Sequence, residues 1–195
     1  MFSPAAERNK RSIQDVLSPA LPASGVLLEL ACGALQHACY IAPYHPNIIW
    51  QPTDINPQAL AHGAGIDRPG NVLQPVHLDV LAQPWPVAQA DIIYSANLLH
   101  ISPSEVPAAL FRGAQRLQVS EVFIYGPFIV DGDPTTESNL RFDESLRARN
   151  SDWGIRQLND VQTTGAYFRY QLAKVTPMPA HNLLLQFTSI AQVAH

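Results

Sequence analysis

The sequence contains little charge and little cysteine, and it has no long apolar segment. Only 14% of its 195 residues are charged, against about 25% in an average globular protein, yet 47% are hydrophobic, which excludes a disordered chain. The two cysteines, Cys32 and Cys39, exclude a disulfide scaffold and favour a reducing compartment. No apolar run approaches the ~20 residues needed to span a bilayer, and the polar start, residues 1–11, is not a secretory signal. These absences predict a soluble, cytoplasmic protein.

A surplus of basic residues is also missing. The chain has 12 Lys and Arg against 16 Asp and Glu, which gives a net charge of −4. Dedicated nucleic-acid binders normally carry a basic surplus, so we expect neither a nucleic acid nor a membrane as a partner. Prolines number 17, which is above the usual share of about 5% and excludes a long-helix bundle or coiled coil. The length predicts a single domain over residues 1–195.

Short apolar runs alternate with helical patterns along most of the chain. Such an alternation predicts βαβ units and a mainly parallel sheet, and two runs near the C-terminus would pair as a hairpin across residues 177–182. The predicted fold is therefore α/β, a Rossmann-like, seven-stranded, mostly parallel sheet with a C-terminal antiparallel hairpin and helices on both faces. The predicted strands are 25–31, 47–54, 71–79, 91–95, 121–128, 167–175 and 183–190, and the predicted helices are 5–17, 36–42, 56–64, 102–117 and 138–150.

Small and acidic residues follow the predicted strands, where open α/β sheets bind their ligands. After the first strand, Cys32 and Gly33 form a small-residue turn that lets a ligand approach the backbone, although an ordinary tight connection would look the same. Asp54 ends the second strand, where a carboxylate can accept hydrogen bonds from ribose hydroxyls. Asp79 ends the third strand, facing the place of an adenine amino group, and Asn97 follows the fourth. Either acid alone is also explained as a helix cap, but their repetition in register favours a nucleotide-like cofactor.

Several stretches spread over the chain carry a resemblance to a known family. The opening, Ser3 to Lys10, reads Ser-Pro-Ala-Ala-Glu-Arg-Asn-Lys. With the stretches given below, it makes the chain resemble a class I S-adenosylmethionine-dependent methyltransferase, and more narrowly a small family of uncharacterised methyltransferase-like proteins with this opening. The resemblance covers essentially the whole chain and is specific for the family rather than for a reaction. The other stretches are 50–54 (WQPTD), 97–101 (NLLHI), 125–128 (YGPF), 138–147 (SNLRFDESLR), 153–156 (WGIR) and 178–182 (MPAHN).

The resemblance implies S-adenosylmethionine as the cofactor and gives roles to individual residues. Asp54 would hold the ribose, and Ile55 would pack on the adenine. Asp79 and the backbone of Val80 would meet the adenine edge, and Asn97 would lie near the methionine moiety or the reacting methyl group. The full set of predicted cofactor-binding residues is Glu29, Ala31, Cys32, Gly33, Asp54, Ile55, Asp79, Val80 and Asn97.

The turn after the first strand departs from the pattern of the family. It would pass under the methionine moiety from Ala31 to Ala34, yet Gly33 is its one glycine, and Leu35 is bulky where a small residue allows close approach. The main hypothesis is methyl transfer to a small-molecule acceptor. The departure motivates a second one, a methyltransferase-like fold that binds a ligand or a protein with weak or no catalysis. A nucleic-acid methyltransferase is disfavoured, because residues 97–100 lack an Asn-Pro-Pro-aromatic arrangement.

Residues outside the cofactor site are candidates for binding or activating the acceptor. His100 follows the fourth strand closely, and it is either a general base or a packing residue before the next helix. Tyr125 ends the fifth strand and either lines the acceptor pocket or belongs to the core. The arginine-rich segment 136–160 would cover an anionic acceptor or pair with its own acids, and the helical segment 1–20 offers a solvated face or a lid. The predicted substrate-binding residues are Arg8, Asn9, Asn139, Arg147 and Trp153, and no metal site is expected.

Overall fold

The computed structural model of the chain describes residues 2–133 and 135–190, and its centre is a twisted β-sheet. The strand order is β3 (Val76–His77), β2 (Ile48–Asp54), β1 (Gly25–Leu30), β4 (Ile92–Ala96), β5 (Glu121–Ile129), β8 (Asn182–Ser189) and β7 (Tyr170–Met178), and β6 (Arg156–Gln157) pairs with β5 outside this path. All pairings are parallel except those of β8, which is antiparallel to both β5 and β7. The predicted Rossmann-like sheet with its antiparallel hairpin is confirmed.

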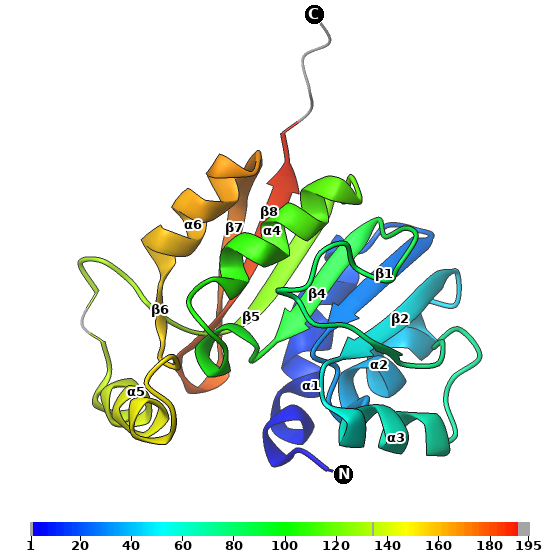
Figure 1. The fold of residues 1–195 in the computed structure, drawn as a ribbon, viewed down its shortest axis with the longest axis horizontal. Helices are drawn as coiled ribbons and strands as arrows, with labels where there is room; N and C mark the ends of the chain where they lie inside the picture. Colours follow the sequence, from blue (N-terminus) through cyan, green and yellow to red (C-terminus); the bar gives the residue numbers. More distant parts are fainter. Residues whose placement is uncertain (1, 134, 191–195) are drawn as a thin grey trace, which may run out of the picture.

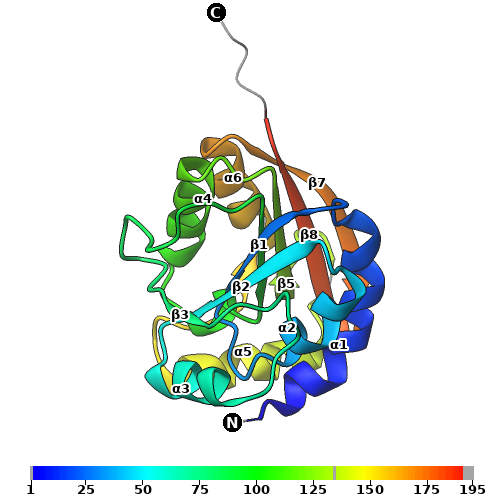
Figure 2. The ribbon, with the colours of Figure 1, turned by 90° about the vertical axis from the view of Figure 1, so that its right-hand side faces the viewer.

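Helices cover both faces of the sheet and the edge where the parallel strands end (Figures 1 and 2). One face carries α4 (Val106–Arg116) and α6 (Leu158–Tyr167), and the other carries α1 (Pro4–Leu17) and α2 (Gln36–Ile41). At the carboxyl edge lie α3 (Pro57–Gly65) and α5 (Glu137–Arg149), together with the start of α1. The single-turn helices are η1 (Ser18–Ala20), η2 (Ala42–Tyr44), η3 (Leu99–Ile101) and η4 (Pro179–His181). Within the described ranges, none of the helices is long and apolar enough to cross a membrane.

Caps and prolines explain where the helices begin. The Ser3 hydroxyl accepts a hydrogen bond from the Ala6 amide at 3.2 Å, and the Asn56 side chain accepts one from the Gln58 amide at 2.9 Å. In both cases a proline occupies the first helical position, where its missing N–H group costs no hydrogen bond. The predicted start of α4 at Ser102 is wrong, because the Ser102 hydroxyl instead donates to the Leu99 carbonyl and closes the η3 turn.

Two other predicted boundaries are wrong near the C-terminus and at the third strand. Neither β6 nor α6 was predicted, and the strand predicted to begin at Tyr167 begins at Tyr170, because α6 continues through Tyr167. The third strand shrinks to Val76–His77, because Pro75 cannot donate to the ladder, and an isolated bridge from Val72 to Trp50 replaces its first half.

The indole ring of Trp85 packs the loop between β3 and β4 against α4. Trp85 is buried, and a β-carbon added at Gly113 would overlap its Cη2 and Cζ2 atoms, so the ring rests directly on the helix backbone. Trp85 Nε1 donates to the Val80 carbonyl at 3.1 Å, and Arg116 Nη2 donates to the Trp85 carbonyl at 3.4 Å. This contact fixes the loop that begins with Asp79.

A buried polar network lies beneath the turn between β1 and α2. Glu29 is 2% exposed, and its Oε2 accepts a hydrogen bond from Trp50 Nε1 at 2.7 Å. His37 Nδ1 lies 4.0 Å from Glu29 Oε1 and 3.3 Å from the Tyr94 hydroxyl, and His37 Nε2 lies 2.8 Å from Asn9 Oδ1 on α1. Burial raises the pKa of Glu29 to about 8 and lowers the pKa of His37 to about 4. Both side chains are therefore mostly uncharged near pH 7, and the network ties α1 to the sheet.

Gly113→Ala is expected to destabilise the protein although alanine is the better helix former. The new methyl group meets the Trp85 ring against the helix backbone, and overpacking of this kind costs about 1–3 kcal/mol. Gly65→Ala, at the end of α3, is the matched control, because no atom lies within 4 Å of its added carbon. Urea unfolding of both variants provides the comparison, and equal free energies of unfolding would show that Trp85 does not press on the helix.

Glu29→Gln is expected to remove a pH dependence of stability. Since the folded pKa of Glu29 rises from its ordinary value of 4.5 to about 8, its contribution to stability is complete below pH 4.5 and is lost as the pH rises to about 8. Glutamine keeps an oxygen for Trp50 and cannot ionise. Relative to wild type, the free energy of unfolding of the variant should gain up to ~1.4 kcal/mol per pH unit between about pH 5 and 8. Urea unfolding across this range measures it, and a difference independent of pH would mean that Glu29 is ionised in the fold.

Candidate functional site

The turn between β1 and α2 has a left-handed backbone at alternate positions. Ala31, Gly33 and Leu35 have φ angles of 57°, 55° and 60°, a region that glycine enters freely and other residues enter at some cost. The turn therefore has three left-handed positions, a backbone conformation that favours glycine, and glycine occupies one of them. The Leu35 side chain is fully buried and meets Gly63 of α3, where an added β-carbon would lie 2.9 Å from Leu35 Cδ1. The bulk of Leu35 thus lies in the core and takes no space at the edge.

Asp54 joins this turn to the end of β2. Its Oδ2 accepts a hydrogen bond from the Gly33 amide and its Oδ1 accepts one from the Asn56 amide, both at 2.8 Å. The cap of α3 is Asn56, so Asp54 itself does not cap the helix. Each carboxylate oxygen can accept more than one hydrogen bond. The carboxylate is 7% exposed, and it is held at the carboxyl edge with acceptor capacity remaining.

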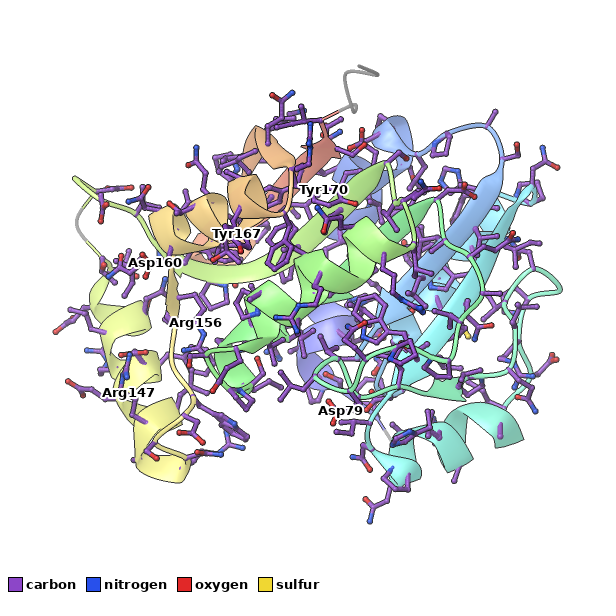
Figure 3. All side chains as sticks on the ribbon, turned by 45° about the horizontal axis from the view of Figure 1, so that its top comes forward. Asp79, Arg147, Arg156, Asp160, Tyr167 and Tyr170 are labelled. Atoms are coloured by element: carbon purple, nitrogen blue, oxygen red, sulfur yellow. The ribbon has the colours of Figure 1, made fainter. Side chains whose placement is uncertain are left out.

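A pocket of about 240 Å³ opens at this edge, between the ends of β1, β2 and β3 and the start of α4. It brings together four residues of the predicted cofactor set, Ala31, Ile55, Asp79 and Val80. Among the described residues that line it, Asp79 is the one that is charged, and Asp79 Oδ1 accepts a hydrogen bond from the Leu81 amide at 2.9 Å. Figure 3 shows Asp79 on the loop at the lower edge of the sheet. The remaining lining residues are apolar or small: Leu78, Leu81, Leu98, Ile101, Ser102, Pro103 and Val106.

Sequence reasoning missed this apolar lining. The stretch 97–101 drew attention to Asn97 and His100, whereas Leu98 and Ile101 between and beside them line the pocket. The available signal for Leu98 and Ile101 was their position just beyond β4, next to the candidates Asn97 and His100. Leucine and isoleucine at strand ends are also typical of ordinary core packing, so this signal was weak.

The other predicted cofactor residues lie outside this pocket. Glu29 points into the buried network with Trp50, and Cys32 is buried, with the pKa of its thiol raised by burial, while its amide donates to the Thr53 carbonyl at 2.9 Å. Asn97 has a left-handed φ of 60°, and its amide donates to the Tyr125 carbonyl at 2.8 Å. The Asn97 side chain is half-buried and makes no hydrogen bond to any described residue.

The two candidate catalytic residues lie in different surroundings. His100 is buried in η3, its ring packs edge-on against Phe142 of α5 at 5.4 Å, and Nδ1 lies 3.6 Å from the place of a β-carbon on Gly126. Burial, aided by the charge of Arg156, lowers the pKa of His100 to about 4, so its ring is neutral at pH 7. Tyr125 is 3% exposed, and burial raises the pKa of its phenol against the opposing effect of a hydrogen bond with Asn9.

Hydrogen bonds of the arginine-rich segment connect α5 to η3. Arg147 Nε donates to Asp143 Oδ2 at 2.8 Å, and the Ile155 amide donates to the other oxygen of Asp143 at 2.6 Å. Arg156 donates to the carbonyls of Leu99 and Ser102 at 3.2 and 2.5 Å. Figure 3 shows Arg147 and Arg156 on this segment, apart from Asp79. Pairing within the protein, the alternative that the sequence left open, thus accounts for these two arginines.

The remaining predicted substrate residues are spread over α1 and α5. Asn9 is tied to His37, whereas Arg8 is exposed on the first turns of α1. The ring of Trp153 lies 5.0 Å from the Arg149 guanidinium. Asn139 is buried in the first turn of α5. Among the described residues, no group of three or more His, Cys, Asp or Glu side chains is placed to hold a metal ion.

Solved methyltransferases have the same fold. Human N-acetylserotonin methyltransferase in complex with SAM matches with a TM-score of 0.79 at 12% identity, covering 96% of this chain and 53% of that one. CalO1, a methyltransferase in calicheamicin biosynthesis in its SAH-bound form, matches with a TM-score of 0.75 at 16% identity (94% and 55% coverage). An O-methyltransferase family 2 protein from Planctomyces limnophilus in complex with apigenin gives 0.75 at 16% identity (95% and 60%). The chain thus spans little more than half the length of these structures.

A family profile described as "Protein of unknown function (DUF938)" matches residues 1–189. The match includes every element of the sheet and the whole carboxyl edge. The chain therefore belongs to the DUF938 family, and its fold is that of class I S-adenosylmethionine-dependent methyltransferases.

Proposed function

We propose that this protein transfers the methyl group of S-adenosylmethionine to a small-molecule acceptor. The observation that carries the proposal is the pocket that gathers Ala31, Ile55, Asp79 and Val80 at the carboxyl edge, where Ile55 directly follows Asp54 at the end of β2. Its support from outside the chain is the fold of proteins crystallised with SAM or SAH. Another protein of this fold, solved in complex with apigenin, gives an example of a small organic ligand on it.

The lining of the pocket fits the adenine end of this cofactor. A flat heterocycle needs apolar walls, which Ile55, Leu78 and Val80 offer, and its amino group needs an acceptor. Asp79 supplies one, because Leu81 occupies only one of its oxygens. The volume of about 240 Å³ is below the roughly 300–1,000 Å³ of sites for whole drug-sized ligands. It is therefore of a size to hold one part of the cofactor.

The ribose and methionine parts would extend along the same edge. Asp54, oriented by two backbone amides, would accept hydrogen bonds from the two ribose hydroxyls. The turn from Ala31 to Gly33 would lie under the methionine moiety, with the unbonded side chain of Asn97 facing it from β4. Cofactor binding would thus use the ends of four neighbouring strands.

His100 would serve the acceptor side of the reaction. When bound, S-adenosylmethionine supplies a methyl group on a positively charged sulfur, so that a bond from the acceptor heteroatom to the methyl carbon forms while the C–S bond breaks and its electron pair stays on sulfur. A hydroxyl or amine acceptor must then lose a proton. The neutral ring of His100, which makes no hydrogen bond to a described residue, would accept that proton or pass it to water.

Calorimetric titration with S-adenosylhomocysteine tests the site, and Asp79→Asn is the informative variant. Losing a charge-assisted hydrogen bond to the adenine costs about 1.5–3 kcal/mol, so the dissociation constant should rise about ten- to hundredfold. Asp160→Asn is the matched control, because Asp160 lies on α6, far along the molecule from Asp79 in Figure 3, and it should bind like wild type.

Two outcomes would decide against this proposal. No binding of S-adenosylhomocysteine or S-adenosylmethionine at millimolar concentration would exclude the cofactor. Tight binding without consumption of S-adenosylmethionine across a broad panel of acceptors would favour the alternative of a ligand-binding module without catalysis. The strained non-glycine residues Ala31 and Leu35 in the turn are the observation that keeps this alternative in view.

A further inference from the structure

A second cavity of about 260 Å³ lies at the carboxyl end of β5, beside the tip of the β7–β8 hairpin. Three of the sequence stretches that carry the family resemblance meet there, although they are far apart in the chain. Phe128 comes from the first, Asn139 from the second, and Met178, His181 and Asn182 come from the third. None of these stretches is explained by the cofactor pocket, whose lining lies on the other side of β4 and β5.

The side-chain amide of Asn139 provides this cavity with a hydrogen-bond acceptor. Asn139 is 9% exposed, and its Nδ2 donates a long hydrogen bond of 3.4 Å to the His181 carbonyl. No described residue donates to its Oδ1. An amide oxygen can accept two hydrogen bonds, so a ligand donor in the cavity would bond to Asn139 Oδ1.

The hairpin tip that forms the facing wall is held in a strained conformation. Ala180 and His181 have left-handed φ angles of 57° and 56°. The Asn182 side chain stabilises them by donating to the carbonyls of Pro179 and Ala180 at 3.0 and 3.3 Å. Strain of this kind persists where the surrounding contacts enforce it, and it is common in ligand-binding walls.

The charges around the cavity are unsuited to an anion. The four arginines of the α5 segment are engaged elsewhere. Arg141 pairs with Glu137 and Arg147 with Asp143, Arg149 lies over the Trp153 ring, and Arg156 binds backbone carbonyls. No Lys or Arg is among the described residues that line the cavity, and Asp133 is among them. A carboxylate or phosphate on the ligand would therefore lack a partner, in contrast to the anionic acceptor that the arginine-rich sequence suggested.

We infer that this cavity is the acceptor site and that it takes a neutral or cationic molecule with one aromatic ring and a hydroxyl or amino donor. The inference rests on the proposed methyl transfer. The ring would pack against Phe128 and Met178, and its donor would bond to Asn139 Oδ1. His100 lies between the two pockets, because it belongs to the η3 segment beside the cofactor pocket and its ring meets β5 at Gly126, two residues before Phe128.

Methyl-labelled methionine provides a direct reporter. The chain has two methionines, and Met178 lines the cavity, so an NMR spectrum of protein with ¹³C-methyl methionine contains one signal from the site, which Met178→Leu identifies. The probes are benzyl alcohol, benzylamine and benzoate, which share a ring and differ in charge. We expect saturable shifts of the Met178 signal with the alcohol and the amine, and at least tenfold weaker binding of benzoate.

Variants at Asn139 test the hydrogen bond. Asn139→Ala should weaken the binding of benzyl alcohol at least threefold. Asn139→Asp should increase the affinity for benzylamine relative to that for benzyl alcohol. Asn159→Ala, an exposed position on α6, is the control and should change neither. Two results would overturn the inference: benzoate binds as tightly as benzyl alcohol, or no probe shifts the Met178 signal. Both are measured on the wild-type protein, so they hold even if a variant fails to fold.

Calorimetry on the same samples separates the two proposals. Asn139→Ala should bind S-adenosylhomocysteine like wild type, because Asn139 is not part of the cofactor pocket. If the probes move Met178 but S-adenosylhomocysteine does not bind, methyl transfer is wrong and the cavity is not an acceptor site. If S-adenosylhomocysteine binds and the probes leave Met178 unmoved, the proposed function stands and this inference fails.

Discussion

The hydrogen bond from the Gly33 amide to Asp54 is the contact on which the carboxyl edge depends. It links the turn after β1 to the end of β2, and the second oxygen of Asp54 fixes the start of the next turn through the Asn56 amide. One carboxylate thereby sets the backbone path at two neighbouring strand ends. Because ligands of open α/β sheets bind outside the carboxyl ends of the strands, a ligand at the ends of β1 and β2 would lie against the backbone that Asp54 orders. The position of the proposed cofactor follows from this constraint.

The strain in the turn is balanced by burial beneath it. Ala31 and Leu35 adopt left-handed backbone conformations that cost roughly 1–2 kcal/mol each. Full burial of a leucine side chain contributes a stabilisation of similar size, about 1.5–3 kcal/mol, and Leu35 is fully buried against α3. Glycine at position 35 would relieve the strain but lose this packing. The departure from a glycine-rich turn is thus consistent with a stable edge.

The residues that the sequence located well are those whose role depends on position along a strand. Asp54 and Asp79 were predicted from strand ends alone, and they lie at the edge because parallel strands end together. Glu29 was predicted from the family resemblance and Arg147 from the charge of its segment, and the orientation of each side chain depends on its partner. Trp50 draws Glu29 inward, and Asp143 occupies Arg147. The Trp50 partner of Glu29 cannot be derived from spacing, because it requires the packed tertiary structure, whereas Asp143 and Arg147 are four residues apart on one helix, a spacing that allows the pair.

The neutral state of His100 has a consequence for the proposed reaction. A protonated imidazole near the reacting centre would repel a sulfonium, and in a buried site that repulsion is weakly screened. The pKa of about 4 keeps the ring uncharged above that pH, because burial and the Arg156 charge both oppose protonation. Arg156 is held in place by the Leu99 and Ser102 carbonyls that flank His100. The arginine would therefore act on the site through electrostatics while binding no substrate, and this gives the arginine-rich segment a functional role that pairing alone does not describe.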